Sequence, residues 1–162
     1  MKWAALILWL LTAGGGFIML GIWLRHGGVA QAREAGTRIR PPLIFSHFGL
    51  AATGLVLWII YLASDNDSIK WIAFALLLVV ALLGFAMLGI WLSRRRAPTA
   101  TAHAAPATAT AGEAAATGTP TAETGRLPAE QHFPISIVAL HGVAAATTLV
   151  LVFLANIGVG GS

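Results

Sequence analysis

Two histidines, His47 and His141, are the residues of this sequence whose type and position could do chemistry. Each lies within about two turns of one end of a long apolar segment, where an ionisable side chain is costly and usually faces the interior of a helix bundle. Two neutral imidazoles on facing helices are the ligation that a six-coordinate haem iron needs, because the porphyrin supplies the other four donors. We therefore predict that His47 and His141 are the metal ligands of one haem b.

Other roles for these two histidines stay open. An imidazole in a membrane helix can instead hydrogen-bond a backbone carbonyl or a hydroxyl group on a neighbouring helix, such as that of Ser46 or Thr147. A chlorophyll-type pigment or another metal would use the same imidazoles. If the sequence is duplicated, one ancestral histidine explains both positions, so the pair counts as one observation.

Small residues follow each histidine on its own helix face, at i+4 and i+7. They are Ala51 and Gly54 after His47, and Ala145 and Thr148 after His141. Such residues leave volume for a flat macrocycle between the helices, and we include all four in the predicted cofactor site. They equally permit close contact between helices without any cofactor.

Three arginines at the ends of the apolar segments, Arg25, Arg40 and Arg94, complete the predicted cofactor site. A guanidinium group forms charge-assisted hydrogen bonds with a carboxylate, so these side chains could pair with haem propionates. The positive charge that accumulates in cytoplasmic loops would place arginines at the same positions for a different reason.

The composition predicts the class of protein that must position these residues. The 162-residue chain is 57% apolar and 10% charged, with a mean hydropathy of +0.81, whereas soluble domains are about 25% charged. Apolar runs cover residues 3–24, 43–63, 71–92 and 135–155, each long enough to cross a bilayer as a helix. We predict an all-α integral membrane protein with four transmembrane helices in contact with the lipid bilayer. The chain has no cysteine, which excludes thiolate sites, and its basic residues lie beside a membrane, so no nucleic-acid partner is expected.

The sequence also contains an internal repeat of two helices. Residues 16–24 recur as residues 84–92 with one difference, Lys2-Trp3 recurs as Lys70-Trp71, and the segment around His47 aligns with that around His141. The four helices are therefore predicted to form two tandem hairpins related by a pseudo-twofold axis along the membrane normal. This axis would bring the two imidazoles to the same depth.

The repeat divides the chain into two membrane hairpins and one loop. The first hairpin is predicted to cover 1–63, and the second 64–96 together with 133–157. Residues 97–132 between them are rich in Ala, Thr and Pro and are predicted to be a flexible cytoplasmic loop, because they have no apolar face to bury.

The distribution of positive charge predicts the orientation in the membrane. All eight arginines lie in the first and third loops, whereas only Lys2 and Lys70 lie on the opposite side. The rule that cytoplasmic loops are positive then places both of these loops in the cytoplasm and both termini outside. We expect the membrane to be a bacterial inner membrane.

Four helices with histidines on facing partners resemble the general plan of small membrane b-type cytochromes, in architecture rather than in sequence motif. We therefore predict an electron-transfer subunit whose partners are other membrane subunits and a quinone. The alternative is a non-catalytic accessory or assembly subunit of a respiratory or photosynthetic complex, in which the histidines are structural. No catalytic residue is expected, and the small size favours a subunit over a free-standing enzyme.

Overall fold

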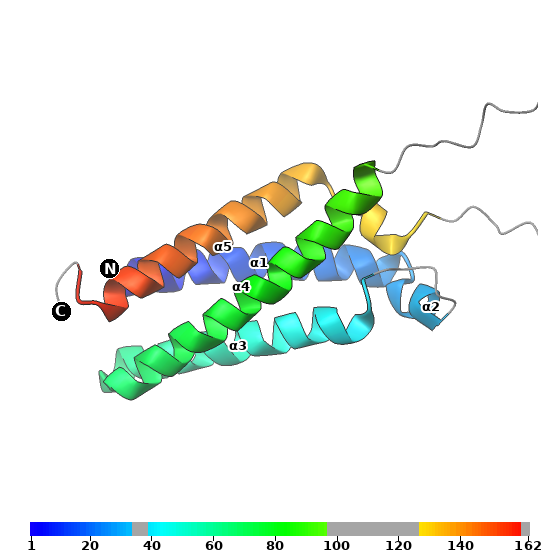
Figure 1. Cartoon of the computed structure of the whole chain (residues 1–162). Helices are drawn as coiled ribbons and strands as arrows, with labels where there is room; N and C mark the ends of the chain where they lie inside the picture. Colours follow the sequence, from blue (N-terminus) through cyan, green and yellow to red (C-terminus); the bar gives the residue numbers. More distant parts are fainter. Residues whose placement is uncertain (34–38, 97–126, 160–162) are drawn as a thin grey trace, which may run out of the picture.

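The computed structural model describes residues 1–33, 39–96 and 127–159, and in these residues it contains helices and no strand (Figure 1). In chain order the elements are α1 Lys2–Arg25, α2 Gly28–Arg33, α3 Pro41–Ser64, α4 Asp67–Arg96, η1 Ala129–His132 and α5 Ile135–Asn156. The four long helices are each apolar and long enough to span a membrane. The prediction of an all-helical fold with four such helices is thus confirmed.

Local sequence explains where α3 and α4 begin and end. Two prolines at the start of α3 suit the first turn of a helix, where no backbone N–H is needed. At its other end Asp65 has a left-handed backbone with φ of 49°. The side-chain oxygen of Asn66 then accepts the backbone N–H of Ser68 at 2.9 Å, an N-cap bond that starts α4 before its apolar run. The resulting two-residue turn holds α3 and α4 antiparallel.

The long helices pack as two close pairs, α1 with α5 and α3 with α4. Contacts between the pairs run from α1 to α3 and from α4 to α5 and are less extensive. In the view of Figure 1, α4 crosses α1 obliquely. Helices α3 and α5 therefore lie diagonally opposite each other, as do α1 and α4. Helices that are diagonal in a four-helix bundle meet only through side chains that reach its centre.

One half of the bundle has a closely packed core. This half includes the N-terminus and the α3–α4 turn, and we call its tip the lysine end after Lys2 and Lys70. The core consists of Ala5, Trp9, Trp58, Tyr61, Ala73, Leu77 and Val152. Most other large apolar side chains on the four helices are partly or fully exposed, which is the surface expected of helices in contact with lipid.

The opposite end of the bundle, the cap end, is closed by α2 and η1 against Trp23 and Trp91. Gln31 joins the two short elements, because its side-chain oxygen accepts the N–H of Ala129 at 2.8 Å. The indole N–H of Trp91 donates to the carbonyl of Glu130 at 3.1 Å. The segment 127–132 is thus ordered, although the sequence predicted a flexible loop over all of 97–132. Residues 97–126 lie outside the described part of the chain.

Gly28 offers a prediction for the cap end. A Cβ atom at this position would lie well inside contact distance of the indole ring of Trp23, which is completely buried. Gly28→Ala is therefore expected to displace α2 from the indole and to lower the unfolding free energy by about 1–3 kcal/mol, the usual cost of overpacking. Unfolding in detergent measures this, with Gly27→Asn as the control because its open site and φ of 78° tolerate asparagine. Equal stability of the two variants would contradict the packing described.

Candidate functional site

The two predicted ligands meet near the centre of the bundle. His47 on α3 and His141 on α5 have ring centroids 6.4 Å apart, with planes inclined at 57°. Both side chains are partly buried. Because α3 and α5 are diagonal helices, the imidazoles are the groups that bridge the bundle between them. The structure therefore brings together the two residues that the sequence paired across the repeat.

Each imidazole is held by a hydrogen bond to the backbone of the helix packed beside it. His47 Nδ1 lies 3.0 Å from the carbonyl oxygen of Val80, and His141 Nδ1 lies 2.9 Å from that of Thr12. A carbonyl only accepts, so in both residues Nδ1 carries the proton and Nε2 keeps its lone pair. A hydrogen bond from the second ring nitrogen to a carbonyl is the usual support of a metal-binding histidine.

Two repeat-equivalent glycines let the imidazoles lie against the neighbouring helices. A Cβ at Gly84 would lie 3.3 Å from Cε1 and 3.8 Å from Nδ1 of His47, and a Cβ at Gly16 would lie at the same two distances from His141. Neither glycine is among the site residues predicted from the sequence. Their recurrence at the same place in each repeat was the signal that could have assigned them to the histidine site.

No side chain in the layer around the histidines is fully buried. The layer comprises residues 10–22 of α1, 41–53 of α3, 81–90 of α4 and 135–147 of α5. Even its shortest segment, that of α4, is about 15 Å of helix at the usual rise per residue. The closely packed core ends at Trp9 and Val80 on one side, and the cap begins at Trp23 and Trp91 on the other. The side chains of the four helices are therefore less buried where the two imidazoles meet than in the core or at the cap.

The four small residues predicted to flank a cofactor fall into two groups. Ala51 and Ala145 are partly buried, one turn from the histidines. Gly54 instead faces the indole of Trp9, whose nearest ring atom would lie 3.2 Å from a Cβ at this position. Thr148 is 1% exposed, and its hydroxyl oxygen lies 3.4 Å from that of Thr12. Gly54 and Thr148 thus belong to the packed side of the site, whereas the two alanines lie in the layer of partly buried residues around the histidines.

The predicted arginines lie at the cap end of the long helices. Arg25 ends α1 and Arg40 directly precedes α3, and both side chains are exposed. Arg94 lies in the last turn of α4, and its side chain is outside the described part of the structure. The backbone thus puts all three on the side of the histidines away from the packed core. Within the described residues, no hydrogen bond of Arg25 or Arg40 fixes where its guanidinium group points.

A second histidine pair lies at the cap end. The rings of His26 and His132 are stacked with centroids 3.8 Å apart and planes inclined at 19°. His26 Nδ1 contacts the carbonyl of Ile22 at 2.8 Å. Stacked rings place their nitrogens side by side, so this pair does not converge on one metal ion.

The described residues contain no cluster of three or more His, Asp or Glu side chains that could hold a metal ion. Two imidazoles alone do not complete the coordination sphere of a metal ion. The remaining donors at His47 and His141 would have to come with a prosthetic group. Comparison of the chain with known protein families, with curated proteins and with solved structures gave no match, and its function is therefore inferred from its own geometry.

Proposed function

We propose that this protein is a membrane electron-transfer subunit that binds one haem b between His47 and His141. The observation that carries the proposal is the separation of the two imidazoles, 6.4 Å between ring centroids. Two metal–imidazole bonds of about 2 Å each, plus about 1 Å from each nitrogen to its ring centre, place imidazoles on opposite sides of a metal about 6 Å apart. The observed spacing fits a metal between the rings.

The donor set and the packing fit a haem as well. The carbonyls of Val80 and Thr12 fix the tautomer and the orientation of each imidazole, so that Nε2 is the nitrogen able to bind iron. Gly16 and Gly84 remove the Cβ atoms that would push the rings aside. The layer of partly buried residues around the histidines supplies apolar side chains from all four helices. Arg25, Arg40 and Arg94 are the residues that could reach propionates at the cap end.

The ligands define the chemistry that such a site supports. A haem held by two histidines has no free iron position, so it exchanges electrons and does not bind oxygen or substrate. The residues of the chain would hold the two imidazoles in place within a largely apolar layer between Trp9 and Trp91. The apolar surroundings and the two carbonyl hydrogen bonds are the means by which the protein would set the reduction potential.

We further propose that the two hairpins are related by a pseudo-twofold axis along the membrane normal. Equivalent contacts support this. Position 80 is position 12 plus the offset of 68 residues that also relates Gly84 to Gly16, and each pair contacts the histidine of the adjacent helix. The pairing of α1 with α5 likewise corresponds to that of α4 with α3. With the positive-inside rule, the cap end faces the cytoplasm of a bacterial inner membrane.

An electron-transfer subunit needs a donor and an acceptor. We propose other subunits of a membrane complex and a quinone for these roles, because the described residues offer no second redox centre. The apolar side chains exposed along all four helices would meet lipid or such subunits.

An absorption spectrum tests the proposed function directly. The purified full-length protein, supplied with haem during expression, is expected to show the reduced-minus-oxidised bands of a six-coordinate b-type haem. His47→Ala and His141→Ala should each remove at least about 90% of that signal, since loss of one axial ligand destroys the site. His26→Ala and His132→Ala are the controls and should retain it. A protein without a haem band, or one whose band survives both ligand substitutions, would rule the proposal out.

One observation favours a second function. The hydrogen bonds of His47 and His141 to backbone carbonyls are also what structural histidines form between membrane helices. In that case the protein is an accessory or assembly subunit of a respiratory or photosynthetic complex. It would then be colourless and would co-purify with a stoichiometric partner, and the histidine substitutions would weaken the α1–α5 and α3–α4 pairs without any spectral change.

A further inference from the structure

The lysine end of the bundle contains a cavity of about 330 Å³. Its polar lining consists of Lys2, Tyr61, Asp65, Asp67 and Lys70, and its apolar lining of Met1, Ala155, Gly158 and Val159. The cavity lies on the far side of the packed core from His47 and His141. It is bounded by the starts of α1 and α4, the end of α3 and the end of α5.

Both lysines of the chain converge on this cavity, although they are 68 positions apart and start different helices. Their ammonium nitrogens lie 5.9 Å and 5.7 Å from the centre of the same Tyr61 ring. Lys2 and Lys70 are equivalent positions of the internal repeat. The repeat thus builds a two-lysine cluster around one aromatic ring.

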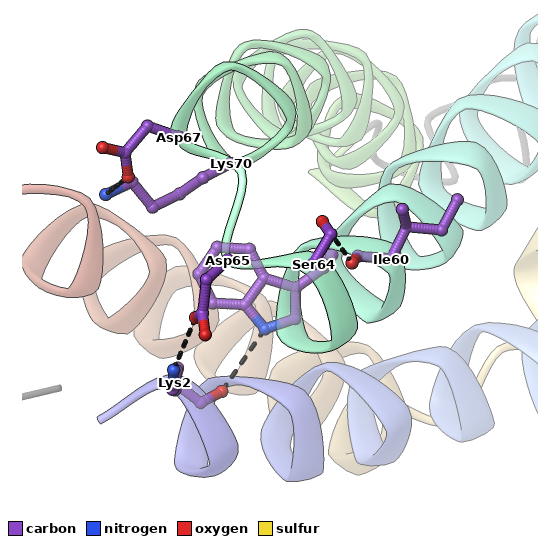
Figure 2. A network of polar contacts seen from close by, with 7 residues as sticks. Lys2, Ile60, Ser64, Asp65, Asp67 and Lys70 are labelled. Carbon is purple, nitrogen blue, oxygen red and sulfur yellow. Dashed lines mark hydrogen bonds and ion pairs between the residues drawn. The ribbon is translucent and has the colours of Figure 1, made fainter.

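Each lysine is paired with an aspartate of the α3–α4 turn, as Figure 2 shows. The Lys2–Asp65 and Lys70–Asp67 distances are both 2.8 Å. The partners differ in burial, since the lysine side chains are 25% and 11% exposed and the aspartates 72% and 81%. The carboxylates are therefore largely hydrated and screened, whereas more of each lysine side chain is covered by the protein, that of Lys70 most.

The ammonium groups have hydrogen-bonding capacity left over. Each carries three donors, and the ion pair with aspartate uses one of them. Two ammonium groups with unused donors thus line one cavity, together with the two aspartates that pair with them.

We propose that this cavity binds a phosphate group, held between Lys2 and Lys70 above the Tyr61 ring. A phosphate offers several acceptor oxygens and at least one negative charge, which matches two ammonium groups with free donors. The cavity lies where the four helices leave the membrane, so the phosphate can come from a lipid headgroup or from a soluble phosphate compound.

Because the chain has only these two lysines, their acetylation rates, measured by peptide mass spectrometry, report directly on whether the cavity is occupied. The full-length protein in maltoside micelles is acetylated in the presence of inorganic phosphate or of phosphatidylglycerol in the micelle. Diacylglycerol with the same acyl chains is the control without a phosphate, and the ionic strength is kept constant. A bound phosphate should slow acetylation of both lysines about tenfold when the probe exceeds its dissociation constant about tenfold. Protection by inorganic phosphate identifies a soluble ligand, and protection by phosphatidylglycerol alone identifies a lipid headgroup.

Substitutions distinguish a phosphate-binding role of the two lysines from a purely structural role in salt bridges. Lys2→Gln should weaken phosphate binding about tenfold, read at Lys70, because one charge-assisted contact is lost. Asp65→Asn should tighten it, because the carboxylate that competes for Lys2 is removed. Arg33→Gln on α2 at the cap end also removes one positive charge and should leave phosphate binding unchanged, and thermal unfolding checks that each variant is folded. Absence of protection by every phosphate probe, or weaker binding in Asp65→Asn, would overturn the proposal.

Discussion

In the proposed haem site, the substitution Gly84→Val is expected to reduce haem retention at least about tenfold, the usual effect of disturbing the groups that support a metal ligand. A single Cβ at this position already lies 3.3 Å from Cε1 of His47, and the two γ-methyl groups of valine extend further. The imidazole would have to turn away, which breaks its hydrogen bond to the carbonyl of Val80 and changes its position relative to the ring of His141.

The repeat supplies matched controls for this experiment. Gly16→Val should have the same effect through His141, because the distances at Gly16 are the same. Gly21 and Gly89 are equivalent to each other in the repeat and lie on the same two helices, but a Cβ atom at either position would have no neighbouring atom within 4 Å. Their valine variants should therefore keep the haem band.

The haem content per protein is measured from the reduced spectrum and the protein concentration. Valine costs a helix slightly less than glycine does, so a loss confined to Gly16 and Gly84 cannot come from helix propensity. Equal haem content in all four valine variants would show that the glycines do not support the histidines.

The substitution Trp58→Ala is expected to lower the unfolding free energy by about 3 kcal/mol, within the range found for large aromatic side chains in protein cores. Trp58 is completely buried, its ring lies 6.4 Å from that of Trp9 and 5.0 Å from that of Tyr61, and its N–H donates to the carbonyl of Lys2 at 3.3 Å. Truncation leaves a cavity in the packed core and removes a contact between α1 and α3.

Reversible unfolding in mixed micelles measures this loss. Trp3→Ala is the control, because Trp3 is 61% exposed and its replacement should change the unfolding free energy by less than about 1 kcal/mol. If the two variants were equally stable, Trp58 would not be part of a core that joins α1 to α3.

The sequence was sufficient to predict the helices because length and hydropathy alone determine whether a segment can span a bilayer. It was insufficient to predict which tryptophans are buried. Trp23, Trp58 and Trp91 lie near the ends of apolar runs, as do Trp3 and Trp71. The first three are nevertheless buried within the bundle, while Trp3 and Trp71 are exposed. Lipid and protein core are equally apolar, so no alternation of polar and apolar residues marks the inward face of these helices.

The histidine site was likewise predictable only in part. The repeat predicted that His47 and His141 would lie at one depth, and the structure places their rings together. The acceptors of their hydrogen bonds are backbone carbonyls of Val80 and Thr12. Every residue has a carbonyl, so side-chain chemistry gives no signal for such a partner. The burial of the side chains around the histidines depends in turn on how each of the four helices is rotated about its axis, which the sequence does not specify.

The pairing of α1 with α5 has a consequence for biosynthesis. Helices enter the membrane in the order in which the ribosome makes them, and α1 is inserted before its main partner exists. The α3–α4 pair, joined by two residues, can form at once, and with it the contact of His47 with Val80. The contact of His141 with Thr12 spans 129 positions and must wait for α5. A nascent chain halted before residue 135 would therefore hold His47 in place before His141 has been made, and α1 would still lack its closest neighbour.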